Sequence, residues 1–376
     1  MNIVAIAGAT IPSDTANSLQ TMKACQALVQ LGHDLTLLVP ANQESSIVNR
    51  QSSIVKLRSH YGLQTDFPIK WLPSSSRRMF TWNAVRHARL RKADLIYSWF
   101  PQSAVFGLLG GLPVVFEIHI QPTGFFGPAW HRAFAILPGR KRLASITRAL
   151  VEMLERDFHM RFPAKDIVIA PNGVELERFT ALPDPAAARR QTGLRETPTV
   201  MCTGHLYAGR GADLFLALAK SFPQVHFVWV GGRPDDIAAW KQRTQLDNVT
   251  FTGFIPNRDL PLYQAAADVL LMPYARSIMG SSGTADSASV ASPMKMFEYM
   301  ATGRAILSAD LPVIHEVLND RNAVFCEPDD LSSWKSALET LLADPGKRLA
   351  LGTQANRDVQ GYTWLSRAER ILNGFV

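Results

Sequence analysis

The sequence has few cysteines and no long hydrophobic stretch. Its three cysteines, Cys25, Cys202 and Cys326, lie far apart and form no CxxC pair, which argues against a disulfide-stabilised secreted protein. No apolar run approaches the roughly 20 residues that a membrane-spanning helix requires. Residues 1–7 carry no basic leader and run into Gly8, so they predict a first strand and not a signal peptide. These absences together indicate a protein of the reducing cytoplasm.

Metal-ligand patterns and a dinucleotide fingerprint are also missing. The nine histidines show no metal-ligand spacing, so we expect neither a metal nor another cofactor. Gly8 would let a ligand come close to the backbone after the first strand, but its surroundings do not form a GxGxxG motif. A dinucleotide site is therefore poorly supported, while Gly8 stays a candidate for ligand contact.

The pattern of strands and helices predicts an α/β protein. With 376 residues the chain is long for one hydrophobic core, and its 47% hydrophobic and 19% charged residues are typical of globular proteins. Short β-branched runs alternate with amphipathic segments of helix length, which predicts doubly wound parallel sheets covered by helices on both sides. The predicted strands are residues 3–7, 35–39, 95–97, 114–118, 145–147, 168–170, 199–203, 226–230, 249–252, 269–272, 305–308 and 323–326.

A polar stretch with several prolines, from about residue 171 to Pro198, separates two halves of the chain. We expect one domain over residues 1–170, a second over 171–360 and a terminal helix over 361–376. Ligands bind at the carboxyl ends of the strands in open α/β sheets, so we expect an active site between the two domains.

Basic residues are concentrated in the first half. Residues 1–170 hold 19 Lys and Arg against 10 Asp and Glu, a net charge of +9, whereas residues 171–376 hold 20 against 22. Much of the excess and several large aromatics lie in two segments: Arg77, Arg78, Phe80, Trp82, Arg86, Arg89, Arg91 and Lys92, then Phe125, Phe126, Trp130, Phe134, Arg140, Lys141 and Arg142. Such a surface suits an anionic membrane or a polyanionic partner. The alternative is a solvated helix face whose aromatics turn into the core.

The segment from Ser292 to Ala301 is typical of a nucleotide pocket. Ser292 can cap a helix that begins at Pro293, and the first backbone N–H groups of that helix would stabilise a diphosphate. Lys295 would lie in the first turn, where a cation opposes the helix dipole unless an anion is bound nearby. Glu298 lies three residues later on the same face and could accept two hydroxyl hydrogen bonds. The alternative is an ordinary surface pair of Lys295 and Glu298; the Gly-, Ser- and Ala-rich residues 277–292 favour a loop that closes over a ligand.

Two further loops follow predicted strands. After residues 199–203 comes a glycine-rich turn, Gly204 to Gly211, in which Arg210 could hold a diphosphate with its planar guanidinium. The alternative is a plain turn with a solvated arginine. His119 follows the strand 114–118 and could bind a sugar hydroxyl or transfer a proton, although isolated histidines are more often structural.

These residues resemble the GT-B fold glycosyltransferases, specifically the retaining enzymes of glycosyltransferase family 4, in the branch with an SPxKxFEYMA-type donor motif. The resemblance covers the whole chain, loosely over residues 1–165 and well from Ile167 onward. The matching segments are residues 171–174, 204–211, 249–253, 267–269 with Pro273, 292–303 and 362–364, where the family's last helix returns to the first domain.

The resemblance implies a role for each matching residue. Arg210 occupies the place of a lysine that binds the donor diphosphate, Glu298 holds the nucleotide ribose, and His119 lies beside the transferred sugar. The catalytic candidates are His119, Arg210 and Lys295. The donor-binding candidates are Gly8, Gly204, Gly253, Phe254, Ile255, Ser292, Pro293, Met294 and Glu298. In retaining members of the fold the departing phosphate is thought to deprotonate the acceptor, so no catalytic carboxylate pair is needed.

The sequence departs from the family pattern at two positions. In this sequence Val290 replaces the first glutamate of the family's Glu-seven-residues-Glu motif. His205 stands where many members have a phosphate-binding arginine. The departures leave open which group contacts the 3- and 4-hydroxyls of the sugar; Ser292 or backbone N–H groups could do so.

The expected function is retaining transfer of a sugar from a nucleotide diphosphate sugar to a hydroxyl of a lipid-linked or polysaccharide-precursor acceptor. We expect residues 1–170 to bind the acceptor and 171–360 the donor, a possible peripheral contact with the inner membrane face, and no nucleic-acid partner. One alternative is a nucleotide-sugar epimerase or hydrolase, for which His119 would need a carboxylate partner that the sequence does not reveal. Another is a sugar-binding protein without enzymatic activity.

Overall fold

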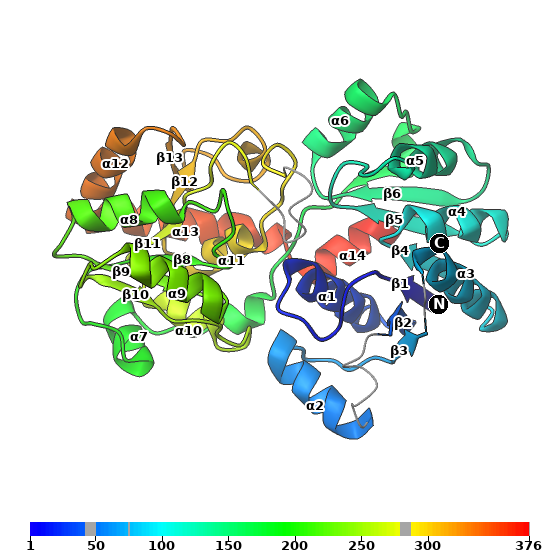
Figure 1. The fold of residues 1–376 in the computed structure, drawn as a ribbon, viewed down its shortest axis with the longest axis horizontal. Helices are drawn as coiled ribbons and strands as arrows, with labels where there is room; N and C mark the ends of the chain where they lie inside the picture. Colours follow the sequence, from blue (N-terminus) through cyan, green and yellow to red (C-terminus); the bar gives the residue numbers. More distant parts are fainter. Residues whose placement is uncertain (42–49, 74–75, 279–286, 376) are drawn as a thin grey trace. The chain divides into compact units, whose positions relative to one another are not determined.

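The computed structural model describes residues 1–41, 50–73, 76–278 and 287–375, with the backbone alone for residues 50–55. The chain divides into two compact units, each built around one parallel sheet (Figure 1). Unit 1 comprises Met1–Asn172 and Trp364–Val376, and unit 2 comprises Gly173–Thr363. The sequence places these divisions after residues 170 and 360.

Unit 1 contains a seven-stranded sheet in the order β3-β2-β1-β4-β5-β6-β7, with every pair of neighbours parallel. Its strands are β1 (Asn2–Ile6), β2 (Asp34–Pro40), β3 (Ile69–Leu72), β4 (Leu95–Ser98), β5 (Val114–Ile118), β6 (Lys141–Ser145) and β7 (Ile167–Ile169). The order reverses between β1 and β4, which makes the carboxyl ends of these two strands the switch point where doubly wound sheets bind ligands.

The helices of unit 1 pack in two groups. α1 contacts α14, and α4 contacts both α3 and α5. They are α1 (Ala16–Gln30), α2 (Arg50–Tyr61), α3 (Arg77–Leu90), α4 (Pro101–Leu109), α5 (Gly127–Ile136), α6 (Arg148–Phe158), the 3₁₀ turn η2 (Ala164–Asp166) and α14 (Trp364–Leu372). The hydroxyls of Thr15, Ser76 and Thr147 accept backbone N–H groups at the starts of α1, α3 and α6, which fixes where these helices begin.

Unit 2 contains a six-stranded parallel sheet in the order β10-β9-β8-β11-β12-β13, with its switch point between β8 and β11. The strands are β8 (Thr199–Thr203), β9 (His226–Val230), β10 (Val249–Phe251), β11 (Val269–Met272), β12 (Ala305–Ala309) and β13 (Val324–Cys326). The helices are α7 (Pro185–Thr192), α8 (Ala212–Ser221), α9 (Pro234–Arg243), α10 (Leu260–Ala265), α11 (Met294–Thr302), α12 (Leu331–Ala343) and α13 (Pro345–Asp358), with 3₁₀ turns η3 (Leu176–Phe179), η4 (Ile314–Glu316) and η5 (Val359–Gly361).

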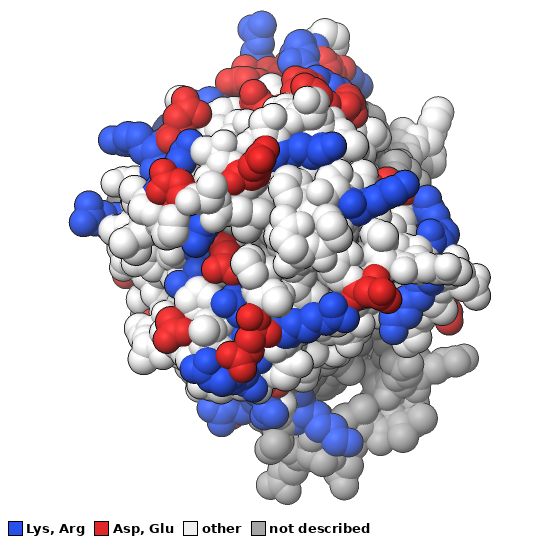
Figure 2. All heavy atoms as spheres, turned by 90° about the vertical axis from the view of Figure 1, so that its left-hand side faces the viewer, with Lys and Arg blue, Asp and Glu red and all other residues white. Residues whose placement is uncertain are grey.

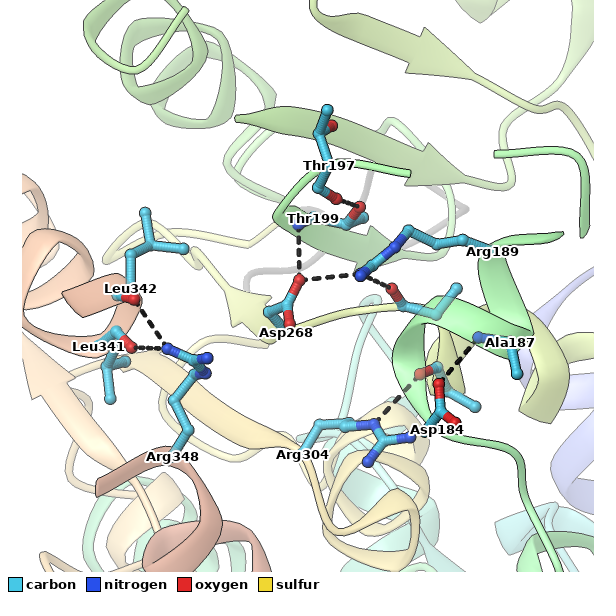
Figure 3. A network of polar contacts seen from close by, with 12 residues as sticks. Asp184, Ala187, Arg189, Thr197, Thr199, Asp268, Arg304, Leu341, Leu342 and Arg348 are labelled. Atoms are coloured by element: carbon cyan, nitrogen blue, oxygen red, sulfur yellow. Dashed lines mark hydrogen bonds and ion pairs between the residues drawn. The ribbon is translucent and has the colours of Figure 1, made fainter. Parts of the chain in front are cut away.

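A polar network fixes the amino ends of the central strands of unit 2 (Figure 3). Asp268, just before β11, accepts from the backbone N–H of Thr199 at 2.8 Å and from Arg189 of α7 at 2.9 Å. Arg304, just before β12, donates to the carbonyls of Ala265 and Pro183 at 3.1 and 2.9 Å. The network ties α7 and α10 to the edge of the sheet opposite the carboxyl ends of the strands.

The predicted α/β class, the two doubly wound units and the return of the last helix to the first unit are confirmed. Two strands of unit 1 were predicted wrongly. β3 was missed because it is a short edge strand flanked by Pro68 and Pro73, and proline is typical of turns and strand ends. β6 begins at Lys141 and not at residue 145, because its first two residues are basic and conceal the strand.

These two basic residues are not part of a basic surface. The Lys141 amine donates to the carbonyls of Phe134, Ala135 and Leu137 at the end of α5, at 2.9, 2.6 and 2.5 Å. The Arg142 guanidinium donates to the carbonyl of Ile371 at the end of α14 at 2.6 Å. Both cations therefore stabilise helix C-termini, where the helix dipole favours positive charge.

None of the described helices combines the length and apolar character that crossing a bilayer would require. On the face drawn in Figure 2, which carries the side of unit 2 at the left of Figure 1, Lys and Arg side chains alternate with Asp and Glu. This mixture agrees with the nearly balanced charge of residues 171–376.

Candidate functional site

Three segments of unit 2 meet at the carboxyl edge of its sheet. β8 ends at Thr203, just before Gly204, and the neighbouring strand β11 ends just before Pro273. α11 begins at this edge because it leads into the parallel strand β12. The segments flank the switch point between β8 and β11, which is the position at which open α/β sheets bind ligands.

Two cationic side chains converge on one tyrosine ring at this edge. The Lys295 amine lies 5.3 Å from the ring centre of Tyr274, and the Arg210 guanidinium carbon lies 5.6 Å from the same centre. The Tyr274 side chain is 1% exposed, and its hydroxyl and the Nε of Arg210 have no hydrogen-bond partner among the described residues. Neither cation forms an ion pair within the described part of the chain, so the described residues supply no counter-charge to this concentration of positive charge.

The thiol of Cys202 also lies close to the two cations. The Lys295 amine lies 3.6 Å from the Cys202 sulfur, at the end of β8. Burial raises the pKa of the Cys202 thiol, and the charges of Lys295 and Arg210 both oppose that rise. Both cations are therefore within electrostatic reach of the same point.

Two glycines bring Arg210 into this position. Gly209 and Gly211 have φ of 78° and 87°, in the left-handed region that favours glycine. A Cβ atom at Gly209 would lie 2.0 Å from the carbonyl oxygen of Ser277, and one at Gly211 would lie 1.8 Å from that of Pro273. Only residues without a side chain let the turn after β8 pack directly against the turn after β11 on both sides of Arg210.

The predicted start of α11 was wrong. The helix begins at Met294, with Pro293 in the N-cap position at ψ 126° and without a side-chain cap, so Ser292 does not cap it. Pro293 takes an extended conformation and not the first helical position, which leaves Ser292 one residue outside the cap. Ser292 is buried just before the helix, and Lys295 is the second helical residue.

Glu298 is buried on α11, with 8% of its surface exposed. Its Oε2 accepts a hydrogen bond from the side chain of Gln264 on α10 at 3.0 Å. Within the described ranges no ion pair joins Lys295 and Glu298, so the alternative of an ordinary surface pair is not what the helix forms. The bond from Gln264 orients the carboxylate and leaves it able to accept further hydrogen bonds.

The ends of β8, β9 and β10 lie side by side. The N–H of Gly231, after β9, donates to the carbonyl of Gly253, after β10, at 2.9 Å. A Cβ atom at Gly231 would lie 2.6 Å from the carbonyl oxygen of Gly204, so the chains touch. The donor-binding candidates Phe254 and Ile255 follow directly, and half of the Phe254 surface is exposed.

His205 stacks on Tyr207 within the turn after β8, with ring centres 4.9 Å apart and an interplanar angle of 12°. Val290 is fully buried near the start of α11. Of the loop expected to close over a ligand, residues 279–286 lie outside the described residues.

In unit 1, His119 follows β5 and has a carboxylate partner. Its Nε2 lies 2.5 Å from Oε1 of Glu117, which is fully buried and also contacts Arg367 of α14. The expectation that His119 lacks such a partner was therefore wrong. Residues i and i+2 of a strand lie on one face, so the spacing from Glu117 to His119 was a usable signal, whereas Arg367 is 250 residues away from Glu117.

The neighbours of Glu117 favour the ionised form of its buried carboxylate. Burial opposes the charge, but the guanidinium of Arg367 and the hydrogen bond with His119 hold the pKa of Glu117 well below its ordinary value. The charge of Glu117 in turn raises the pKa of Arg367, against the opposing effect of burial.

Gly8 lies at the switch point of unit 1, after β1. A Cβ atom at Gly8 would lie 2.0 Å from the ring of Phe100, which follows β4. The ring of Phe100 therefore accounts for the missing side chain, and ligand contact at Gly8 stays a prediction. Within the described residues no cluster of three or more His, Cys, Asp or Glu side chains could hold a metal.

Comparisons with known proteins match both halves of the chain. Residues 20–178 match the family model described as "Glycosyltransferase Family 4", and residues 197–344 match the one described as "Glycosyl transferases group 1".

Two curated relatives cover about three quarters of the chain. A GDP-mannose-dependent alpha-(1-6)-phosphatidylinositol monomannoside mannosyltransferase of Mycolicibacterium smegmatis is 25% identical over 300 residues, which are 74% of this chain and 75% of that protein. A GDP-mannose-dependent monoacylated alpha-(1-6)-phosphatidylinositol monomannoside mannosyltransferase of Corynebacterium glutamicum is 28% identical over 315 residues, 76% of this chain and 77% of that protein.

Among solved structures, Anabaena HepE in complex with UDP superposes with a TM-score of 0.73, covering 100% of this chain and 99% of HepE at 17% identity. At this identity the likeness shows the fold. None of the proteins named here supports the alternative of an epimerase or hydrolase.

Proposed function

We propose that the chain, a GT-B glycosyltransferase, is a retaining hexosyltransferase with a nucleotide diphosphate sugar as donor. Its two halves match the models of glycosyltransferase family 4 and of the group 1 glycosyl transferases. The observation that carries this proposal is the convergence of Arg210 and Lys295 on Tyr274 at the switch point of unit 2, where no described residue neutralises them.

The two cations suit the charge that develops during transfer. When the bond between the sugar and the diphosphate breaks, negative charge grows on the departing phosphate oxygen, and fixed donors that meet it there lower the barrier more than they strengthen donor binding. Glu298, oriented by Gln264, would accept hydrogen bonds from the ribose hydroxyls. With two cations at the phosphate we expect no requirement for a metal ion.

Retention requires attack on the face from which the phosphate leaves. The departing phosphate oxygen would then take the proton of the acceptor hydroxyl, and no catalytic carboxylate pair would be needed. His119 would contact the transferred sugar from unit 1. That the two sites face each other across a cleft stays a prediction.

The first donor to test is GDP-mannose, because both curated relatives carry that donor in their names. UDP-sugars come next, because UDP is bound to HepE. A thermal-shift screen of nucleoside diphosphates and their sugars identifies the base, since a ligand that binds only the folded protein raises its apparent stability. Incubation of that donor with and without candidate acceptors then tests transfer against hydrolysis, and the anomeric configuration of the product by NMR tests retention. An inverted product would refute the retaining mechanism.

We propose a lipid-linked acceptor, reached by peripheral contact of unit 1 with an anionic membrane. The helices α3, α4 and α5 pack in series and contain no Asp or Glu. Their aromatics divide into two groups. Phe80 and Phe134 are in the core, whereas Trp82 of α3 is 62% exposed. Trp82 contacts Phe106 edge-to-face, and Phe106 contacts Trp130 in the same way. The exposed members of this face include Arg78, Met79, Trp82, Arg86, Arg89 and Ile136, with Phe125 and Phe126 just before α5.

Exposed apolar rings among arginines, without a carboxylate, fit the interface of an anionic bilayer. The test is co-sedimentation of the protein with phosphatidylglycerol vesicles and with phosphatidylcholine vesicles. We expect binding to the anionic vesicles alone and its loss in Trp82→Ser, whereas Leu349→Ser, at an exposed leucine of unit 2, is the matched control. Equal sedimentation with both vesicle types would refute the membrane contact.

A further inference from the structure

A buried carboxylate connects His119 to the C-terminal helix within unit 1. Arg367 of α14 lies 2.8 Å from Oε1 of Glu117 through Nη2 and donates to Oε2 through Nη1 at 3.0 Å. His119 Nε2 lies 2.5 Å from the same Oε1. The guanidinium and the imidazole therefore share one carboxylate, although the two residues lie far apart in the sequence.

Further donors to Glu117 come from α1 and β4. Gln20 of α1 donates to Oε1, and the hydroxyl of Tyr97 on β4 donates to Oε2. The Cys25 thiol of α1 is the remaining titratable neighbour, and its pKa is raised by burial and by the charge of Glu117. An ionised carboxylate accepts and cannot donate, so this set of neighbours suits the charged form.

This environment determines the tautomer of His119. Because Glu117 can only accept, Nε2 of the histidine must carry the hydrogen, and in the neutral ring Nδ1 is left as an acceptor. Nδ1 has no hydrogen-bond partner among the described residues, and the His119 side chain is 24% exposed. The ring is thus held at one nitrogen and available to a ligand at the other.

We propose that Glu117 and Arg367 are positioning residues that act through His119. They fix the orientation of the ring and its Nε2–H tautomer, so that Nδ1 accepts a hydrogen bond from a hydroxyl of the transferred sugar. The inference rests on the proposed glycosyl transfer and on the expected place of His119 beside the sugar. It gives the C-terminal helix α14 a part in the chemistry of unit 1.

Arg367 also has contacts that serve the fold alone. Its Nε donates to the carbonyls of Ala170 and Pro171 at 3.2 and 3.0 Å, where the chain leaves β7. Arg367→Met would therefore weaken the attachment of α14 as well as the link to His119. Glu117→Gln keeps the size of the side chain and tests the link more selectively, and the double variant removes both charges together.

The kinetic test compares Glu117→Gln in the wild-type chain and in a His119→Ala background. We expect kcat to fall on the order of 10- to 100-fold in the wild-type chain, the range known for groups that orient metal-ligating histidines. The affinity for nucleoside diphosphate should be unchanged, because that site lies in unit 2. In the His119→Ala background the same substitution should cost less than about twofold, because the residue through which it acts is gone. Equal losses in both backgrounds would overturn the proposal. Arg370→Met, at an exposed arginine of α14, is the control and should leave kcat unchanged.

A spectroscopic test needs no activity. The full-length chain with ¹⁵N-labelled histidine is examined by NMR at a pH raised until the His119 ring is neutral, and the His119 signals are assigned by their loss in His119→Ala. We expect a protonated Nε2 and an unprotonated Nδ1 in the wild type, and a mixture of tautomers in Glu117→Gln. An Nδ1–H tautomer in the wild type would overturn the inference. The predicted tautomer without transfer from any donor would refute the proposed function alone.

Discussion

Replacing one of the two cations beside Tyr274 should separate catalysis from stability. Arg210→Met and Lys295→Met each remove one positive charge while keeping an unbranched side chain of similar reach. Neither cation has an ion-pair partner among the described residues, and both approach the same ring, at 5.6 and 5.3 Å. In the absence of a ligand the two charges repel each other, so either substitution should leave the unfolding temperature unchanged or raise it.

The cost should appear when the phosphate departs. A unit charge about 4 Å from a phosphate oxygen contributes about 4 kcal/mol at an effective dielectric constant near 20. Removing one fixed donor from a developing oxyanion typically lowers kcat about 100- to 1,000-fold. We therefore expect kcat for sugar transfer to fall about 100-fold in each single variant, with a smaller change in the donor KM.

The assay measures initial rates of product formation over a range of donor concentrations, together with thermal unfolding of each variant without ligand. Arg210→Lys should recover part of kcat, because it restores the charge but not the planar guanidinium. Arg258→Met is the matched control, since Arg258 is an exposed arginine of unit 2 that pairs with the neighbouring Asp259. Wild-type kcat and KM in both Arg210→Met and Lys295→Met would refute the reasoning.

Three further predictions follow from other parts of unit 2. Glu298→Gln should raise the donor KM about tenfold or more with little change in kcat, because it removes the carboxylate expected at the ribose while keeping an acceptor for Gln264. Steady-state kinetics measure both constants, and an unchanged KM would show that Glu298 does not bind the donor. Asp268→Asn should lower the free energy of unfolding by about 3 kcal/mol, since it leaves Arg189 without its charged partner, and should not alter the activity per folded molecule; urea unfolding and rate assays test both parts. Burial and the charges of Arg195 and Arg189 lower the pKa of His226 from 6.5 to about 4, so below pH 6.5 the unfolded chain binds a proton that the folded chain does not, and stability should decrease as the pH falls toward 4. In urea unfolding between pH 7 and 4, the free energy of unfolding of His226→Gln should decrease less than that of the wild type. An identical pH dependence in the two proteins would contradict the lowered pKa of His226.

Local sequence was sufficient for most of the fold and for the two cations. Strands that are buried on both faces appear as short β-branched runs. Arg210 was proposed from the glycine-rich turn after a strand and Lys295 from the helix start after Ser292, and both lie beside Tyr274. Their part in catalysis stays a prediction. Tyr274 was missed, because nothing around it distinguishes a tyrosine that lies between two cations from other tyrosines. Its position directly after Pro273 and β11 was the available signal.

The contacts that depend on distant parts of the chain could not be predicted. Arg367 contacts Glu117 although 250 residues separate them. Arg142 was predicted to lie on a basic surface, but it donates to a carbonyl at the end of α14. Trp82 and Phe80 lie two residues apart on one helix, yet the first is exposed and the second is in the core. Sequence alone gives the helical period of α3 but not which of its faces the sheet covers.

The most direct test of the central claim is the affinity of the chain for nucleoside mono- and diphosphates, measured by isothermal titration calorimetry. For the base identified by thermal shift, we predict that the diphosphate binds at least about tenfold more tightly than the monophosphate, and that this preference disappears in the Arg210→Met/Lys295→Met double variant. Equal affinities in the wild type, or a preference that survives in the double variant, would contradict a diphosphate site at Arg210 and Lys295.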